Sequence, residues 1–208
     1  MPGETLLGAV GQLHGADVRG VVVVVHGGQS VSTAPTSPTQ LGVLRMLPLV
    51  RAIRRQLRST GSVVWQPRLQ VRGWNGAAAS PVADLAGLLD EIPASIGQVP
   101  IVLVGHSMGA RAVLRAAGHP HVSAVAGLAP WVPPGEPTEQ LAGRRVLLVH
   151  GDADRTTSPP ETWSYAEQAR AVTTTATIEI RGGEHALLRR VGLWHRIAAD
   201  FARSSLGL

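Results

Sequence analysis

The chain has 208 residues, 44% of them hydrophobic and none of them cysteine, so it can bury one large core and has neither disulfides nor a thiol nucleophile. Its formal net charge is +5, but all 19 basic residues are arginines spread along the sequence, and only 3% of residues are aromatic. This distribution argues against a nucleic-acid-binding surface. No apolar run reaches the roughly 18 residues of a membrane span.

Residues 1–10 lack the basic start and the apolar stretch of a signal peptide. We therefore expect one cytoplasmic domain over residues 1–208, with no membrane partner. The sequence does not indicate an oligomeric state.

Short β-branched runs alternate with helical patterns along the chain. Strands are expected near residues 5–10, 18–25, 62–66, 100–105, 122–128, 145–149 and 176–181, and helices near 40–58, 82–95, 107–118, 160–171 and 186–203. This alternation predicts an α/β fold with a mostly parallel sheet of about six or seven strands and helices on both faces. The runs 21–25 and 101–104 are apolar without alternation, as in central strands. Segment 5–10 is more ambiguous than the other runs, and an antiparallel edge strand is the alternative for it.

The helix expected at 40–58 carries the one cluster of basic side chains in the sequence. Its members share one side of the helix and are Arg51, Arg54, Arg55 and Arg58. A solvated helix face is the simpler interpretation of this cluster than an anion-binding patch. We expect no nucleic-acid partner.

The stretch 100-PIVLVGHSMGARAVLRAAG-118 joins a buried strand to an amphipathic helix with no loop between them. Its centre, Gly105-His106-Ser107-Met108-Gly109, has the G-x-S-x-G pattern. Such a turn forces its central residue into a strained backbone conformation and holds the Ser107 hydroxyl above the sheet edge. The flanking glycines let the backbones pack closely. The alternative is that Ser107 only caps the helix.

A serine hydroxyl is a poor nucleophile without a base, and candidate partners follow two later strands. The segment 145-RVLLVHGDADRTTSP-159 runs out into Asp152 and Asp154, and 176-ATIEIRGGEHALL-188 runs out into Glu184 and His185. The chain order is therefore serine, aspartate, histidine. Because the carboxyl ends of parallel strands share one edge of a sheet, these side chains are expected to meet there.

These motifs resemble those of serine hydrolases of the α/β-hydrolase fold, over almost the whole chain from about residue 18. The family's acid loop reads H-G-x-x-D with a proline soon after, which His150 to Asp154 and Pro159 match; by that register Asp154 is the acid and Asp152 is not. The resemblance implies an α/β-hydrolase fold. It also implies that Ser107 attacks an acyl carbonyl, His185 moves the proton, and Asp154 orients the imidazole.

The same resemblance indicates the donors of an oxyanion hole. The N–H of Met108 is the first candidate. The second belongs to His26-Gly27-Gly28-Gln29, where related hydrolases use the residue after H-G; this is Gly28, with Gln29 as the neighbour that can replace it. The Gln29 side chain is also a candidate to line the substrate pocket. Alternatively, the two glycines only make a tight turn.

Two tryptophans are candidates for the substrate pocket. Trp74 lies in 71-VRGWNGAAASP-81, similar to an R-G-W loop of related hydrolases, and either walls the acyl pocket or packs beneath the serine turn. Trp131 lies in 129–144, where many relatives insert a helical lid. This segment is too short for a cap domain, so an open, lidless site is expected.

The resemblance as a whole implies a small esterase-like serine hydrolase that cleaves accessible acyl esters through an acyl-enzyme. A thioesterase or a peptidase of the same fold is the nearest alternative, because the leaving group is not encoded in the three residues. An alternative of another class is a non-catalytic binding protein with this fold. No cofactor is implied, and no His, Asp or Glu spacing indicates a metal site.

Overall fold

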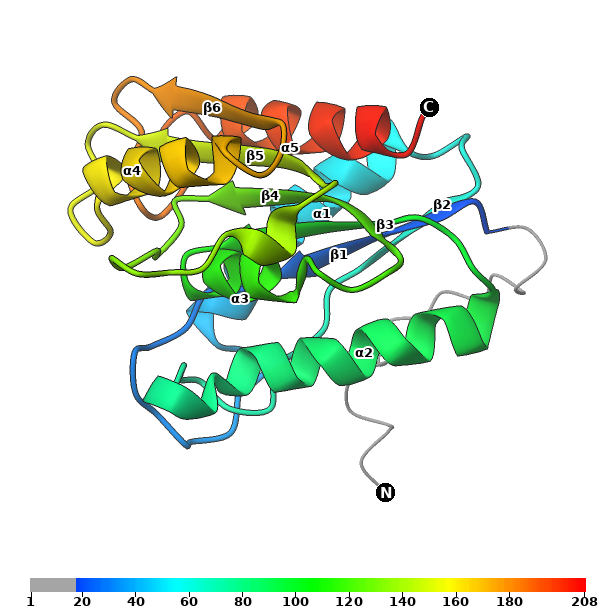
Figure 1. The fold of residues 1–208 in the computed structure, drawn as a ribbon, viewed down its shortest axis with the longest axis horizontal. Coiled ribbons are helices and arrows are strands. Elements are labelled where there is room, and N and C mark those ends of the chain that lie inside the picture. The colour runs from blue at the N-terminus through cyan, green and yellow to red at the C-terminus, as the bar shows by residue number, and fades with distance from the viewer. Residues whose placement is uncertain (1–17) are drawn as a thin grey trace.

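The computed structural model describes residues 18–208, which form a parallel β-sheet with helices on both faces (Figure 1). Across the described residues the sheet has six strands in the order β2-β1-β3-β4-β5-β6, and every neighbouring pair is parallel. The strands are β1 (Gly20–Val25), β2 (Ser62–Trp65), β3 (Ile101–His106), β4 (Val122–Leu128), β5 (Arg145–Gly151) and β6 (Thr175–Ile180). The helices are α1 (Leu41–Gln56), α2 (Ser80–Ile96), α3 (Met108–Ala116), α4 (Pro159–Arg170) and α5 (Val191–Ser205), with short 3-10 turns η2 (Gly76–Ala78) and η3 (Glu139–Leu141).

The predicted fold class is confirmed for these elements. The additional strand predicted at 5–10 lies outside the described residues.

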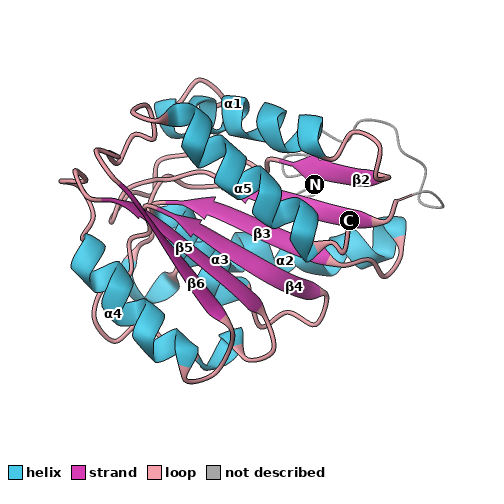
Figure 2. Ribbon diagram, turned by 90° about the horizontal axis from the view of Figure 1, so that it is seen from above, coloured by secondary structure: helices cyan, strands magenta, loops and turns pink. Residues whose placement is uncertain are grey.

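The central strands are apolar on both faces because each face is covered by helices. In β1, Val21 and Val23 point into the core beneath α2, α3 and α4, whereas Val22 and Val24 point into the core beneath α1 and α5. Figure 2 shows α1 and α5 side by side on the second face. The lack of polar alternation in the sequence is therefore explained by burial on both sides.

The strand order changes direction between β1 and β3. From β1 the chain moves outward to β2, and it then returns to add β3 on the other side of β1. The loops that follow β1 and β3 consequently diverge at their carboxyl ends, which is the place where open α/β sheets leave a crevice for ligands. The segment from His26 and the G-x-S-x-G turn both begin at this point.

The last helix begins later than its apolar pattern indicates. The expected range was 186–203, but α5 starts at Val191 because Leu187 and Arg190 have φ values of 58° and 59°. A helix cannot continue through residues in this left-handed region. The consequence is a five-residue connection between His185 and the helix, and this connection borders the candidate site.

The segment 129–144 between β4 and β5 is a loop whose only regular element is the 3-10 turn η3. No cap domain is inserted there, as the sequence predicts. None of the described helices is long and apolar enough to cross a membrane.

Candidate active site

The turn between β3 and α3 places Ser107 in a strained conformation, with φ 56° and ψ −121°. The serine side chain makes no capping hydrogen bond to α3, so the alternative of a simple helix cap is not supported. A Cβ on Gly105 would lie 2.4 Å from the carbonyl oxygen of Gly109, and a Cβ on Gly109 would lie 2.6 Å from that of Val25. Glycine at both positions therefore lets α3 pack directly against β3 and β1.

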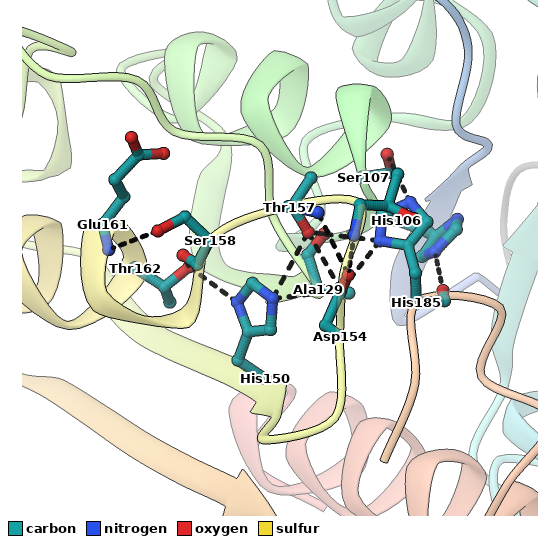
Figure 3. Close-up of polar contacts among 11 residues, drawn as sticks. His106, Ser107, Ala129, His150, Asp154, Thr157, Ser158, Glu161, Thr162 and His185 are labelled. Atoms are coloured by element: carbon teal, nitrogen blue, oxygen red, sulfur yellow. Dashed lines mark hydrogen bonds and ion pairs between the residues drawn. The ribbon is translucent and has the colours of Figure 1, made fainter.

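The three residues that the sequence predicts for the triad lie within one chain of hydrogen bonds (Figure 3). Nδ1 of His185 lies 2.8 Å from Oδ2 of Asp154, and its Nε2 lies 3.0 Å from Oγ of Ser107. A carboxylate only accepts hydrogen bonds, so Nδ1 carries the proton and Nε2 of the neutral ring accepts from the serine hydroxyl. The imidazole thus has the tautomer that a general base for Ser107 requires.

The two aspartates of the acid loop have different partners. The carboxylate of Asp154 is fully buried and accepts hydrogen bonds from the N–H groups of Thr156 and Thr157 at 2.7 and 3.0 Å. Asp152 is exposed and accepts from the N–H of Gly182 at 2.6 Å, which ties the loop after β5 to the loop after β6. Of the two, Asp154 is the one that contacts His185.

The environment of Asp154 keeps its carboxylate ionised. Burial alone raises its pKa, but the hydrogen bonds from His150, His185 and the N–H groups of Thr157 and Thr156 together outweigh burial and hold the pKa below its usual value. Asp154 is therefore an anion at neutral pH, within hydrogen-bond distance of His185.

Two neighbours of Asp154 were not identified as site residues from the sequence. Nε2 of the fully buried His150 lies 3.1 Å from Oδ2 of Asp154, and its Nδ1 lies 2.7 Å from the Thr162 hydroxyl. The Thr157 hydroxyl lies 3.0 Å from the same Oδ2 and 3.1 Å from Nδ1 of His185. The signal for His150 was its place in the H-G-x-x-D motif, whereas Thr157 carried no signal beyond its nearness to the acid.

His106, which precedes the serine, contacts the histidine loop rather than the serine. Its Nε2–H donates to the backbone carbonyl of His185 at 2.8 Å, and the ring is 1% exposed. Burial, with smaller contributions from the charges of His185 and Arg45, lowers the pKa of His106 to about 3. The ring is neutral at physiological pH and holds the backbone of residue 185 in place.

The candidate oxyanion donors lie beside Ser107. Met108 is the first residue of α3, and within residues 18–208 neither its N–H nor that of Gly28 has a backbone acceptor. The N–H of Gln29 donates to the carbonyl of Arg72 at 2.8 Å, so of these two candidates only Gly28 has a backbone N–H without a backbone acceptor among the described residues. A Cβ on Gly28 would lie 2.3 Å from the same Arg72 oxygen, which explains why glycine stands here. The side chain of Gln29 is exposed.

The two tryptophans pack against each other rather than forming an open wall. Trp74 is 3% exposed and meets Trp131 edge-on, with ring centroids 6.1 Å apart. The guanidinium of Arg111 lies 3.9 Å from the Trp74 centroid and 4.6 Å from that of Trp131. Arg111 and Arg115 both pair with the buried Glu136. This burial favours packing over pocket lining for Trp74, whereas Trp131 is half-buried.

The loop 129–144 is attached directly to the serine turn. The N–H of Ser107 donates to Leu128 O at 3.1 Å, and the N–H of Trp131 donates to Ser107 O at 3.3 Å. A cavity of about 650 Å³ opens at the acid and histidine loops, and Asp154, His185 and polar residues including Arg155, Glu184 and Arg189 line it. Among the described residues, no group of three or more His, Asp or Glu side chains is arranged to hold a metal ion.

Comparisons with known proteins agree with this architecture. A family model described as alpha/beta hydrolase fold matches residues 21–171. Est1E from Butyrivibrio proteoclasticus has a similar structure (TM-score 0.68, 15% identity, covering 92% of this chain and 90% of that one). A monoacylglycerol lipase from Paleococcus ferrophilus also has a similar structure (TM-score 0.65, 15% identity, covering 89% of this chain and 94% of that one). An α/β serine hydrolase without a lid from Xanthomonas campestris is also similar in structure (TM-score 0.59, 20% identity, covering 92% of this chain and 86% of that one). No curated protein is significantly similar in sequence.

Proposed function

Because the chain belongs to the alpha/beta hydrolase fold family, we propose that it is a serine hydrolase that cleaves small, accessible acyl esters through an acyl-enzyme. One observation carries this proposal. Oγ of Ser107 lies 3.0 Å from Nε2 of His185, while Nδ1 of the same ring lies 2.8 Å from the buried carboxylate of Asp154. A nucleophile, its base and the group that orients the base are the three parts that acyl transfer requires.

In the first half of the proposed reaction, Oγ of Ser107 attacks the acyl carbon of the ester while its proton moves to Nε2 of His185. The imidazolium that forms is stabilised by Asp154, which stays ionised. The tetrahedral intermediate then collapses. The bond from the acyl carbon to the leaving oxygen breaks, Nε2–H protonates that oxygen, and the alcohol departs from an acyl ester on Ser107.

In the second half, water takes the place of the alcohol. His185 removes a proton from the water as its oxygen attacks the acyl carbon, and the second tetrahedral intermediate releases Ser107, which recovers its proton from Nε2. The products are a carboxylic acid and the free enzyme. Water is the only co-reactant, so the reaction balances with the side chains already described.

The negative charge of both intermediates develops on the former carbonyl oxygen, and the proposal assigns its stabilisation to the N–H groups of Met108 and Gly28. Gly28 belongs to closely packed backbone, and the Met108 N–H lies at the positive end of α3. Donors that are already oriented need no rearrangement as charge develops, and a single such donor is typically worth about 10²- to 10³-fold in kcat.

One further observation supports an accessible ester as the substrate. The loop 129–144 leaves the site without a cap, which suits substrates whose acyl group is easily reached. Among proteins of similar structure, one is named as a monoacylglycerol lipase and another as an esterase domain from Rhodothermus marinus. At 15% and 18% identity these neighbours show the fold alone, so the proposal depends on the residues of this chain.

The test is the intact mass of the protein after incubation with a fluorophosphonate, which reacts with serine activated by a base. We expect a single adduct on the wild type and none on Ser107→Ala or His185→Ala. Ser59→Ala, at an exposed position on the turn after α1, is the matched control and should label like the wild type. Absence of an adduct on folded wild type would refute an activated serine and favour a non-catalytic binding protein.

A further inference from the structure

An apolar groove of about 300 Å³ lies between the start of α1 and the connection from His185 to α5. Four of its hydrophobic side chains remain exposed: Leu41 (73%), Leu44 (41%), Leu188 (65%) and Val191 (42%). The only ionisable side chains that line it are Arg45 and His195. Single exposed leucines are common on protein surfaces, but a contiguous apolar hollow is typical of a binding site.

Both walls of the groove follow from local structure. In α1, Met46, Leu49, Val50 and Ile53 form the stripe that packs on the sheet, and Leu41 and Leu44 form a second apolar row one turn apart. On the opposite wall, Leu187 has φ 58° and its side chain is 3% exposed, so it anchors the connection in the core. The next residue, Leu188, is left at the surface.

The groove adjoins the candidate active site at one wall, where Ala186 lines both the groove and the cavity that Asp154 and His185 border. Ala186 and Leu187, which line it, directly follow His185. At the other wall, α1 begins against the loop after β1 that contains Gly28. A Cβ on Gly42 would lie 2.8 Å from the carbonyl oxygen of Gly27, the neighbour of Gly28. The groove therefore lies next to the loops that carry the base and the proposed oxyanion donor.

From this placement we infer that the groove binds an aliphatic chain of the ester substrate. The inference rests on the proposed function and adds the substrate class, which is esters with a chain longer than acetyl or ethyl. A volume near 300 Å³ is at the lower end for small-molecule sites, and suits a chain of moderate length rather than a bulky ring system. Each methylene that moves from water into the groove is expected to raise kcat/KM by up to about fourfold.

The chain that binds is either the acyl chain or the alcohol chain, and kinetics distinguishes them. We compare kcat/KM for p-nitrophenyl octanoate and acetate, which varies the acyl chain, and for octyl and ethyl acetate, which varies the alcohol chain. In one of the two pairs the wild type should prefer the long chain. Leu44→Ser should lower that ratio about tenfold, because a hydroxymethyl group replaces an apolar wall.

Leu47→Ser is the matched control. Leu47 is on the same helix and is 38% exposed, close to the 41% of Leu44, but it does not line the groove. Its ratios should equal those of the wild type. Equal changes in both variants, or no preference for a long chain in either series, would overturn the inference. The inference would also be overturned if Leu44→Ser changed the molecular mass of the protein in solution and left the kcat/KM ratios unchanged. The groove would then be an interface between copies of this chain.

A binding measurement separates the groove from the proposed chemistry. Titration of the Ser107→Ala variant with octanoate and with acetate compares two carboxylates that differ only in chain length. Tighter binding of octanoate, weakened by adding Leu44→Ser and unaffected by adding Leu47→Ser, supports the groove even if the wild type hydrolyses no ester. Hydrolysis of every ester at a rate independent of chain length, with equal binding of both carboxylates, would overturn the groove and leave the proposed hydrolase intact.

Discussion

Replacement of Asp154 by asparagine tests the proposed acid with almost no change in shape. Oδ1 of Asp154 accepts from two backbone N–H groups, so the amide oxygen of asparagine will occupy that position. The amide NH₂ then replaces Oδ2 and faces Nδ1 of His185 and Nε2 of His150, and both nitrogens must become acceptors. The ring proton of His185 moves to its Nε2, and this imidazole can no longer accept a proton from Ser107.

The expected loss in kcat is about 10⁴-fold, the size typical of a triad histidine held in the wrong tautomer. The matched control is Asp152→Asn. Asp152 accepts one hydrogen bond, from Gly182, and an amide oxygen can accept it equally well. We expect this control to retain kcat within about threefold, because a surface hydrogen bond contributes on the order of 1 kcal/mol and none of it to the transition state.

The assay is steady-state hydrolysis of p-nitrophenyl acetate by both variants and the wild type, with thermal unfolding recorded to verify that each protein is folded. The predicted signature is a loss in kcat with little change in KM, because the missing interaction forms only as His185 becomes charged. Similar losses in the two variants, or a larger loss in Asp152→Asn, would refute the assignment of the acid.

Three further outcomes are expected. Gly109→Ala should lower the free energy of unfolding, measured in urea, by about 1–3 kcal/mol, because its Cβ would lie 2.6 Å from a carbonyl oxygen of β1. As the control, Gly87→Ala lies at an open position of α2 and should raise the free energy of unfolding by about 0.5–1 kcal/mol. Glu136→Gln should cost about 3 kcal/mol by leaving the mostly buried Arg111 unpaired; an unchanged midpoint would contradict this. Because the pKa of His106 falls to about 3 on folding, stability should decline from pH 6.5 toward 3, and the decline should be shallower in His106→Gln.

The sequence was sufficient to identify the residues that meet at the sheet edge. Ser107, Asp154 and His185 each follow a strand within five residues, and in a parallel sheet those positions converge whatever the details of the loops. The strands themselves were predictable because burial on both faces leaves uninterrupted apolar runs, as in β1 and β3. Sheet geometry predicted which strand ends would meet, and the resemblance to the family's acid loop selected Asp154 over Asp152, which follows the same strand.

Features that depend on loop conformation were not predictable in the same way. The start of α5 was misplaced because Ala186, Leu187 and Leu188 continue a helical pattern, and no glycine or proline marks the positive φ at Leu187. The hydrogen bond from the N–H of Gln29 to Arg72, which favours Gly28 as the candidate donor, joins residues that are distant in sequence. Such contacts arise only after tertiary packing and leave no local pattern.

The attachment of the loop 129–144 has a consequence for engineering. The N–H of Trp131 is hydrogen-bonded to the backbone carbonyl of Ser107, and the carboxylate of Glu136 forms ion pairs with two arginines. The loop is therefore anchored at two residues that are five positions apart. At its tip, Gly135 has φ 82° and nothing within 4 Å of a Cβ position. A segment inserted at this tip would replace the turn in which the N–H of Glu136 donates to the carbonyl of Pro133, while the hydrogen bond from Trp131 to Ser107 would remain. This loop is therefore a place where an engineered lid segment can be inserted to change the substrate selectivity of an uncovered site.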